Sequence, residues 1–158
     1  MRTTKIKNLA SKIKDIYQTQ DPIEILDMRG VKVLALELDE DMDYFEGAYF
    51  GNKDINMVVY NKNLKRSRKK LVLWHETGHS IIHGDYNINS ITKNISILSG
   101  REELEADIFA AEAIIDDDTF LDYVKVYRYT DAQIANDLNI PVKYVQLKYK
   151  NFDKSKLV

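Results

Sequence analysis

Residues 71–82, which read LVLWHETGHSII, decide the fold. Apolar residues on both sides of a polar centre predict a buried helix, and Gly84 lies where its C-terminus is expected. Residues four apart share one face of an α-helix, so the imidazoles of His75 and His79 can converge on one cation. Glu76 leaves the helix about 100° further round, where its carboxylate can reach a metal-bound water without binding the metal. The stretch therefore predicts two metal ligands and a general base.

His83 lies one turn further along the same helix. A straight helix rises about 6 Å over four residues, so three successive histidines cannot all reach one ion. We interpret His83 as a supporting group near the helix end, with His75 and His79 as the ligands. The alternative is that both are buried histidines without a metal, and the apolar helical setting favours the metal.

A third metal ligand has to come from outside this helix. A catalytic zinc takes three protein ligands and one water, and the chain has no fourth histidine, so a carboxylate is required. Asp85 is a weaker candidate, because zinc patterns with an acid at this spacing need glycine where this chain has Ile82. Helical periodicity returns over residues 101–115. The acidic candidates there are Glu102, Glu103, Glu105 and Asp107.

Helix phase distinguishes these candidates. Positions seven and eleven after Glu103 are apolar, so its stripe is expected to face the core. The same positions after Glu105 are Glu112 and Asp116, so that stripe is expected to be exposed. Glu103 is therefore the preferred ligand, and Asp107, one turn on, is placed to hydrogen-bond a ligating histidine.

The segments before the motif predict an α+β fold. Apolar residues at helical spacing indicate a first helix over residues 6–16 and a short second one over 23–26, and a strand is expected over 31–38. Two strand-like runs, 47–50 and 55–60, flank the turn sequence Gly-Asn-Lys-Asp and predict a hairpin.

The hairpin and the basic run that follows it both bear on the site. An edge strand at Gly47, Ala48 and Tyr49 can pair with an extended substrate through main-chain hydrogen bonds, or it can simply complete the sheet. The basic run over residues 62–70 is expected to form the solvent side of the active-site helix, with Leu64 and Leu71 facing inward.

Composition limits the class of protein. The 158 residues carry a formal net charge of −2, which gives no global electrostatic basis for nucleic-acid binding. There is no cysteine, so disulfides, cysteine zinc sites and thiol catalysis are excluded. No apolar run is long enough to span a membrane, and residues 1–20 lack a signal-peptide core. These features predict a soluble, cytoplasmic protein.

The C-terminal part is expected to be helical. Residues 130–141 read as a capped helix and a turn, and 142–149 as a second helix, an arrangement similar to a helix-turn-helix. We favour a hairpin that packs on the domain or grips a protein over one that contacts DNA. Residues expected in the core at helical spacing are Phe120, Tyr123, Val124 and Tyr127. We predict a single domain over 1–158, with a core to about 116 and a helical subregion over about 117–158.

Two stretches, HETGHSIIH at 75–83 and ELEADIFAA at 103–111, resemble the ImmA/IrrE metallopeptidases. The strand at 47–49 and the basic run are also similar to that family. This chain lacks the proline that often closes the family's second helix. Three aspartates follow Ile115 instead.

The resemblance implies a zincin-like fold and a zinc ligand set of His75, His79 and Glu103. It also implies a peptidase that cleaves a helix-turn-helix repressor and so releases silenced genes of phages and mobile elements. Composition and spacing alone indicate only a metal hydrolase.

A peptidase mechanism leaves one role unassigned. Zinc would activate a water, Glu76 would accept its proton, and the oxyanion would need a further donor, for which Tyr86 and Tyr49 are candidates. The alternative function is a regulator that uses its zinc structurally and grips a repressor or DNA without cutting it. Loss of cleavage in Glu76→Gln with zinc retained would separate these two functions.

Overall fold

The computed structural model describes residues 2–84 and 100–158. The helices are α1 (Arg2–Tyr17), α2 (Pro22–Met28), α3 (Arg66–Ile82), α4 (Gly100–Ile114), α5 (Asp117–Leu121), α6 (Asp131–Leu138) and α7 (Val142–Asn151). Shorter turns are the 3-10 helices η1 (Glu40–Met42) and η4 (Lys154–Leu157) and the π-helix η3 (Asp122–Val126). With the strands β1 (Lys32–Leu36), β2 (Gly47–Gly51) and β3 (Asn56–Asn61), these elements confirm the predicted α+β fold.

The sheet has three strands in the order β1-β3-β2. β1 runs parallel to β3, and β2 and β3 form the predicted antiparallel hairpin, with Gly47 opposite Tyr60 and Gly51 opposite Asn56. The strand ends differ from the prediction by one residue, since Gly51 belongs to β2 and Ile55 precedes β3. β2 is therefore an outer strand.

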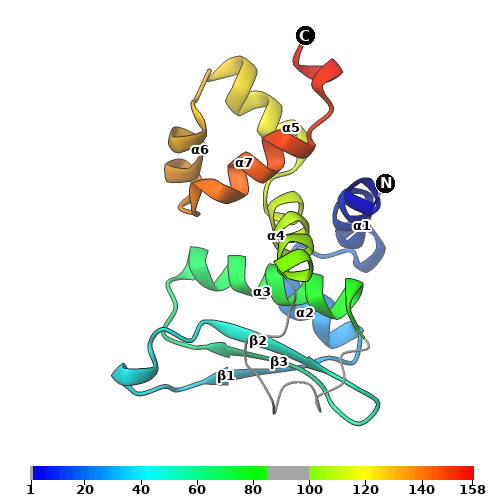
Figure 1. Cartoon of the computed structure of the whole chain (residues 1–158), viewed down its shortest axis with the longest axis vertical. Coiled ribbons are helices and arrows are strands. Elements are labelled where there is room, and N and C mark those ends of the chain that lie inside the picture. The colour runs from blue at the N-terminus through cyan, green and yellow to red at the C-terminus, as the bar shows by residue number, and fades with distance from the viewer. Residues whose placement is uncertain (1, 85–99) are drawn as a thin grey trace.

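Helix α3 lies between the sheet and helix α4 (Figure 1). It begins at Arg66, so Leu64 precedes the helix and does not form part of its inward face, contrary to the prediction. Leu71 does face inward and is 1% exposed. This placement puts one side of α3 against β2 and β3 and the other against α4.

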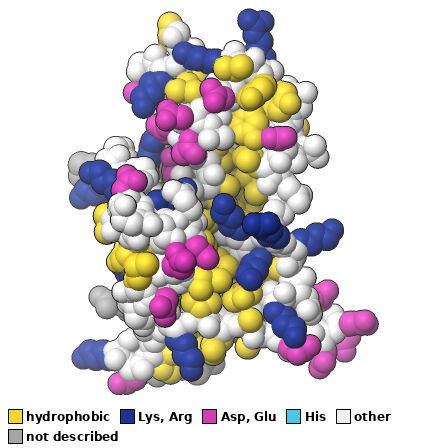
Figure 2. Space-filling model, turned by 180° about the vertical axis from the view of Figure 1, so that it is seen from behind, with side chains coloured by type: hydrophobic (Ala, Val, Ile, Leu, Met, Phe, Trp, Pro, Cys, Tyr) yellow, Lys and Arg dark blue, Asp and Glu magenta, His cyan; other side chains and the backbone are white. Residues whose placement is uncertain are grey.

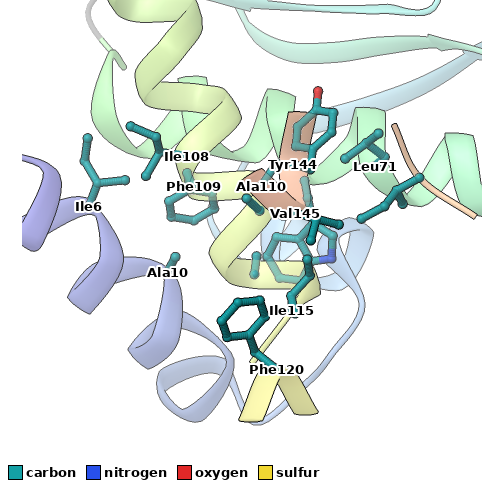
Figure 3. Packing of buried hydrophobic residues seen from close by; sticks show 14 of the residues in the cluster. Ile6, Ala10, Leu71, Ile108, Phe109, Ala110, Ile115, Phe120, Tyr144 and Val145 are labelled. Carbon is teal, nitrogen blue, oxygen red and sulfur yellow. The ribbon is translucent and has the colours of Figure 1, made fainter. Parts of the chain in front are cut away.

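Two hydrophobic clusters hold these layers together. The smaller one joins the sheet to α2 and α3 through Leu26, Val58 and Leu73. The larger one runs from α1 through α3 and α4 into the C-terminal helices, and Figure 3 shows part of it around Phe109 and Val145. The C-terminal helices thus share their core with the helix that carries the motif.

Two side chains that fit the apolar helical spacing in the sequence are exposed. Ile16 is 64% exposed, because α1 buries Ile6, Ala10 and Ile13 and ends one residue after Ile16. Tyr127 is 59% exposed, because the segment after α5 winds as a π-helix and helical spacing no longer holds there.

The predicted C-terminal hairpin consists of α6 and α7. Thr130 and Gln133 form a capping box at the start of α6, and Asn139 ends it in the left-handed conformation with φ of 52°. α7 packs against both α6 and α4. No helix within the described ranges 2–84 and 100–158 is long and apolar enough to cross a membrane.

Candidate metal centre

A glycine lets α3 and α4 approach closely. A Cβ atom at Gly78 would lie 3.2 Å from the Cβ of Phe109 and 3.3 Å from the Cα of Ala106, so a larger residue would push α4 away. Gly78 directly precedes His79, and the close approach brings the acidic first turns of α4 opposite the histidines of α3.

Three side chains converge where these helices meet. The Nε2 atoms of His75 and His79 lie 3.1 Å apart, and the carboxylate oxygens of Glu103 lie 3.3 Å from the first and 3.5 Å from the second. A tetrahedral zinc with bonds of 2.0–2.1 Å separates its ligand atoms by about 3.3–3.4 Å. The group therefore has the donor types and the spacing that a zinc ion requires.

The Nδ1 atom of His75 is held by α4 and α7 together. It lies 3.0 Å from Oδ1 of Asp107. The same oxygen accepts a 2.8 Å hydrogen bond from the hydroxyl of Tyr144, and Oδ2 accepts one of 3.0 Å from Nζ of Lys143. The first turn of α7 thus fixes the carboxylate that fixes the His75 ring.

The Nδ1 atom of His79 is held by a separate chain of groups. It lies 3.0 Å from Nδ1 of His83, whose Nε2 lies 3.1 Å from Oε2 of Glu105. The other oxygen of Glu105 contacts Nε of Arg2 at 2.8 Å and Nε of Arg101 at 3.1 Å. His83, the C-cap of α3, therefore supports His79 from the side remote from Glu103.

The expected exposure of the Glu105 stripe is wrong for Glu105 and Glu112, although Asp116 is exposed as expected. Glu105 is 6% exposed and Glu112 only 4%, whereas the side chain of Glu103 is 45% exposed. Glu105 can be buried because His83 and two arginines surround its carboxylate, and Glu112 because Lys148 does so. Glu103 still faces the histidines, since the first turn of α4 points at α3.

These contacts fix where the protons of neutral imidazoles lie. His75 donates its Nδ1–H to Asp107. His79 donates its Nδ1–H to His83, which in turn donates its Nε2–H to Glu105. In this arrangement the Nε2 lone pairs of both His75 and His79 are free to coordinate a metal.

Negative charge gathers around the histidines. Burial alone lowers the pKa of His75, but the carboxylates of Asp107 and Glu103 outweigh it and raise this pKa to about 10. Contacts with His75 and then His79 hold the pKa of Glu103 far below its ordinary value. Such an environment favours a cation, which competes with the proton for the same imidazole.

Glu76 is buried beside this group. It is 6% exposed, and burial raises its pKa to about 7, against the lowering effect of His75 and of a hydrogen bond from the backbone N–H of Tyr49. A carboxyl group with a pKa near neutrality can both accept and return a proton.

The outer strand β2 runs close to Glu76. A Cβ atom at Gly47 would lie 2.6 Å from Cγ1 of Val72 and 3.6 Å from Cγ of Glu76, so glycine allows the strand to touch α3. Together Gly47, Ala48 and Tyr49 form the strand that the sequence singles out for substrate. The hydroxyl of Tyr49 donates to Oδ1 of Asn56 at 3.0 Å and lies 3.5 Å from the carbonyl oxygen of Gly84, while its backbone N–H donates to Glu76.

Sequence reasoning did not find every residue at the centre. The sequence patterns assign Lys143 and Tyr144 no role at the centre, and they predict that Glu105 is an exposed acid. Tyr144 is 37 residues from Asp107 in the chain, so no local pattern could join them. The other suggested candidates, Tyr86 and Asp85, lie outside the described residues.

Comparison with known proteins bears on this geometry. Residues 27–150 match the model of peptidase family M78, described as the IrrE N-terminal-like domain. The chain belongs to this family. M78 is the ImmA/IrrE family of metallopeptidases that the two motif stretches resemble, and the matched residues include the whole His-His-Glu group.

Relatives of this M78 chain include a phage protein and a bacterial one. It is 27% identical over 153 residues to uncharacterized immunity region protein 2 of Bacillus phage phi105. The aligned residues cover 94% of each chain. It is 24% identical over 139 residues to metallopeptidase ImmA of Bacillus subtilis (strain 168), which covers 86% of this chain and 79% of that one.

The fold is similar to that of a solved bacterial protein. A Mycobacterium tuberculosis transcriptional regulator superposes with a TM-score of 0.60 at 12% identity, over 92% of this chain. The match covers 46% of that protein, so this chain spans less than half of it.

Proposed function

We propose that the protein is a zinc-dependent endopeptidase whose zinc ligands are His75, His79 and Glu103. The observation that carries the proposal is the set of three donor atoms 3.1–3.5 Å apart, with buried Glu76 next to them. Within the described residues the group offers three ligands, as a catalytic zinc site does, whereas a structural zinc site is closed by a fourth protein ligand.

The residues of this chain have distinct roles in the proposed reaction. Held by His75, His79 and Glu103, a zinc ion would lower the pKa of a water and would polarise the scissile carbonyl. Glu76 accepts the proton of the attacking water and passes it to the leaving amine. Asp107 and His83 hold the two histidine rings, so the ligands need no reorganisation.

Strand β2 is the proposed substrate-binding edge. It is an outer strand, and Gly47 lets its backbone lie against the helix that carries Glu76. An extended peptide that pairs with β2 would therefore run past the proposed base.

The proposed substrate is a helix-turn-helix repressor, whose cleavage would switch on phage or mobile-element genes. This part of the proposal rests on the family resemblance and on the relative from a phage immunity region. We place the enzyme in the cytoplasm, where a DNA-binding repressor acts.

The test is incubation of the purified protein with helix-turn-helix repressors encoded in the same genome, followed by mass spectrometry of the products. Wild type with zinc should give two fragments. Glu76→Gln should keep its zinc and give none, and Glu40→Gln, an exposed acid on η1, should cleave as wild type does. Unimpaired cleavage by Glu76→Gln would remove Glu76 from the base role. Binding of the repressor without cleavage by wild type would favour the non-catalytic regulator.

A further inference from the structure

Three tyrosines form a cluster at the end of the molecule remote from the sheet, between α5 and α6 (Figure 1). The ring centroids of Tyr123 and Tyr129 lie 5.8 Å apart and their planes are 26° from parallel. Tyr127 lies 6.1 Å from the first ring and 5.6 Å from the second. Tyr127 is 59% exposed and Tyr129 37%, so the cluster presents ring surface to solvent.

The backbone is shaped to hold these rings together. Arg128, between Tyr127 and Tyr129, has φ of 54°, a left-handed conformation that is uncommon for residues other than glycine. The N–H of Tyr129 donates to the carbonyl of Tyr123 at 2.9 Å, which closes the turn. The preceding π-helix, η3, is a rare form that often occurs at functional sites.

The cluster lines a hollow of about 360 Å³. Its lining residues are Tyr123, Tyr127, Tyr129, Thr119, Asp122 and Asp137. A second hollow of about 340 Å³ shares Tyr129 and Asp137 with the first and extends along the exposed side of α6. The two hollows together could accept a side chain and part of its backbone.

The hydroxyl of Tyr123 donates a hydrogen bond to Oδ2 of Asp137, but no cationic side chain in the part of the chain that the structure describes pairs with the acids of the hollow. No lysine, arginine or histidine there forms an ion pair with Asp122 or Asp137, and no cation lies over the three rings. Elsewhere cations do cover rings, such as Lys154 over Tyr149 at 3.6 Å. Figure 2 shows acidic, hydrophobic and basic side chains next to one another over this end of one face, with a further group of lysine and arginine side chains nearer its middle.

We propose that this hollow binds an arginine side chain of a protein partner. Ring faces attract cations through their quadrupole, and a carboxylate pairs with a guanidinium through two parallel hydrogen bonds. Arginine satisfies both demands at once, because its planar group can stack on a ring while its edge meets a carboxylate. Exposed Tyr127 supplies the ring face, and Asp122 and Asp137 supply the carboxylates.

The proposal does not depend on the peptidase function, since neither a metal nor Glu76 takes part. It assigns the C-terminal part of the chain a role in protein recognition, through one arginine side chain of the partner. The recognised group is a single exposed arginine, so binding should weaken as the salt concentration rises.

The test uses the full chain and short capped peptides with one central residue. Tyrosine ring signals are followed by NMR during titration with Ac-Gly-Arg-Gly-amide and with the same peptide carrying citrulline, which is neutral and of similar shape. The arginine peptide should give a saturable shift and the citrulline peptide none. Tyr127→Ala and Asp137→Asn should each weaken binding roughly tenfold, as expected for loss of a cation–π contact or a charged hydrogen bond.

Two controls keep the result interpretable. Tyr44→Ala removes a tyrosine that lies two residues after η1 and is 78% exposed, and this variant should bind as wild type does. Tyr127→Phe keeps a ring and should retain most of the affinity. Unfolding midpoints show whether each variant is folded. No saturable shift, equal shifts with citrulline, or unchanged binding by Tyr127→Ala would overturn the proposal. A lysine peptide that binds as tightly would overturn the choice of arginine.

Discussion

The hydroxyl of Tyr144 offers a direct test of how the metal centre is held. Tyr144 is 4% exposed and its hydroxyl donates a 2.8 Å hydrogen bond to Oδ1 of Asp107, the oxygen that also faces His75. Burial, followed by the charge of Asp107, raises the pKa of Tyr144, so the hydroxyl remains a donor at neutral pH. Tyr144→Phe removes this donor and leaves the ring in place.

The expected magnitude follows from the groups involved. A hydrogen bond to a charged acceptor contributes about 1.5–3 kcal/mol. Among the described residues the other donor to Asp107 besides His75 is Lys143, whose side chain is 57% exposed and contributes less. We expect Tyr144→Phe to lower the free energy of unfolding by about 1.5–3 kcal/mol. Because Asp107 orients His75, the dissociation constant for zinc should rise roughly 10- to 100-fold.

Two assays measure these effects separately. Urea unfolding of the metal-free protein gives the stability, and competition with a chelator gives the zinc affinity. Tyr149→Phe is the matched control on the same helix, since its hydroxyl makes no hydrogen bond within the described residues. A loss of stability with unchanged zinc affinity would refute the argument that α7 positions the His75 ring.

Two further predictions concern Lys148, which is 1% exposed and bonds Glu112 and Asp117 at 2.7 Å each. Lys148→Met should lower the free energy of unfolding by about 3–5 kcal/mol, because it leaves buried Glu112 without its cation, and urea titration that finds equal stability would contradict this. Burial raises the pKa of Asp117, but the contact with Lys148 outweighs burial and lowers this pKa to about 2. Wild type should therefore exceed Asp117→Asn in free energy of unfolding by about 1–2 kcal/mol after solvent screening. This difference should be present above about pH 4 and should vanish as pH falls to about 2. A constant difference across that range would contradict the assignment.

Periodicity explains which features could be predicted from the sequence. The four-residue repeat placed His75 and His79 on one face of α3, and alternation with turn residues located the hairpin that carries Gly47. The same reasoning placed Glu103 and Asp107 on one helix, one turn apart. These are local patterns, and local patterns survive folding when a strong core fixes the elements.

Features that depend on distant partners could not be predicted. Glu105 resembles a surface acid in its own helix, and only Arg2 and His83, from other elements, make its burial possible. Likewise Tyr144 resembles a packing residue until α7 is placed against α4. Tyr127 was assigned to the core by helical spacing, which the π-helix before it breaks.

The measurement that tests the central claim most directly is the zinc content of purified wild type and Glu103→Ala by mass spectrometry. A site built from His75, His79 and Glu103 predicts about one zinc per wild-type chain and a variant that loses most of it at the same zinc concentration. Leu104→Ala, at an exposed neighbouring position, should retain its zinc. Wild type that stays empty when zinc is supplied, or Glu103→Ala that binds zinc as tightly as wild type, would contradict the claim.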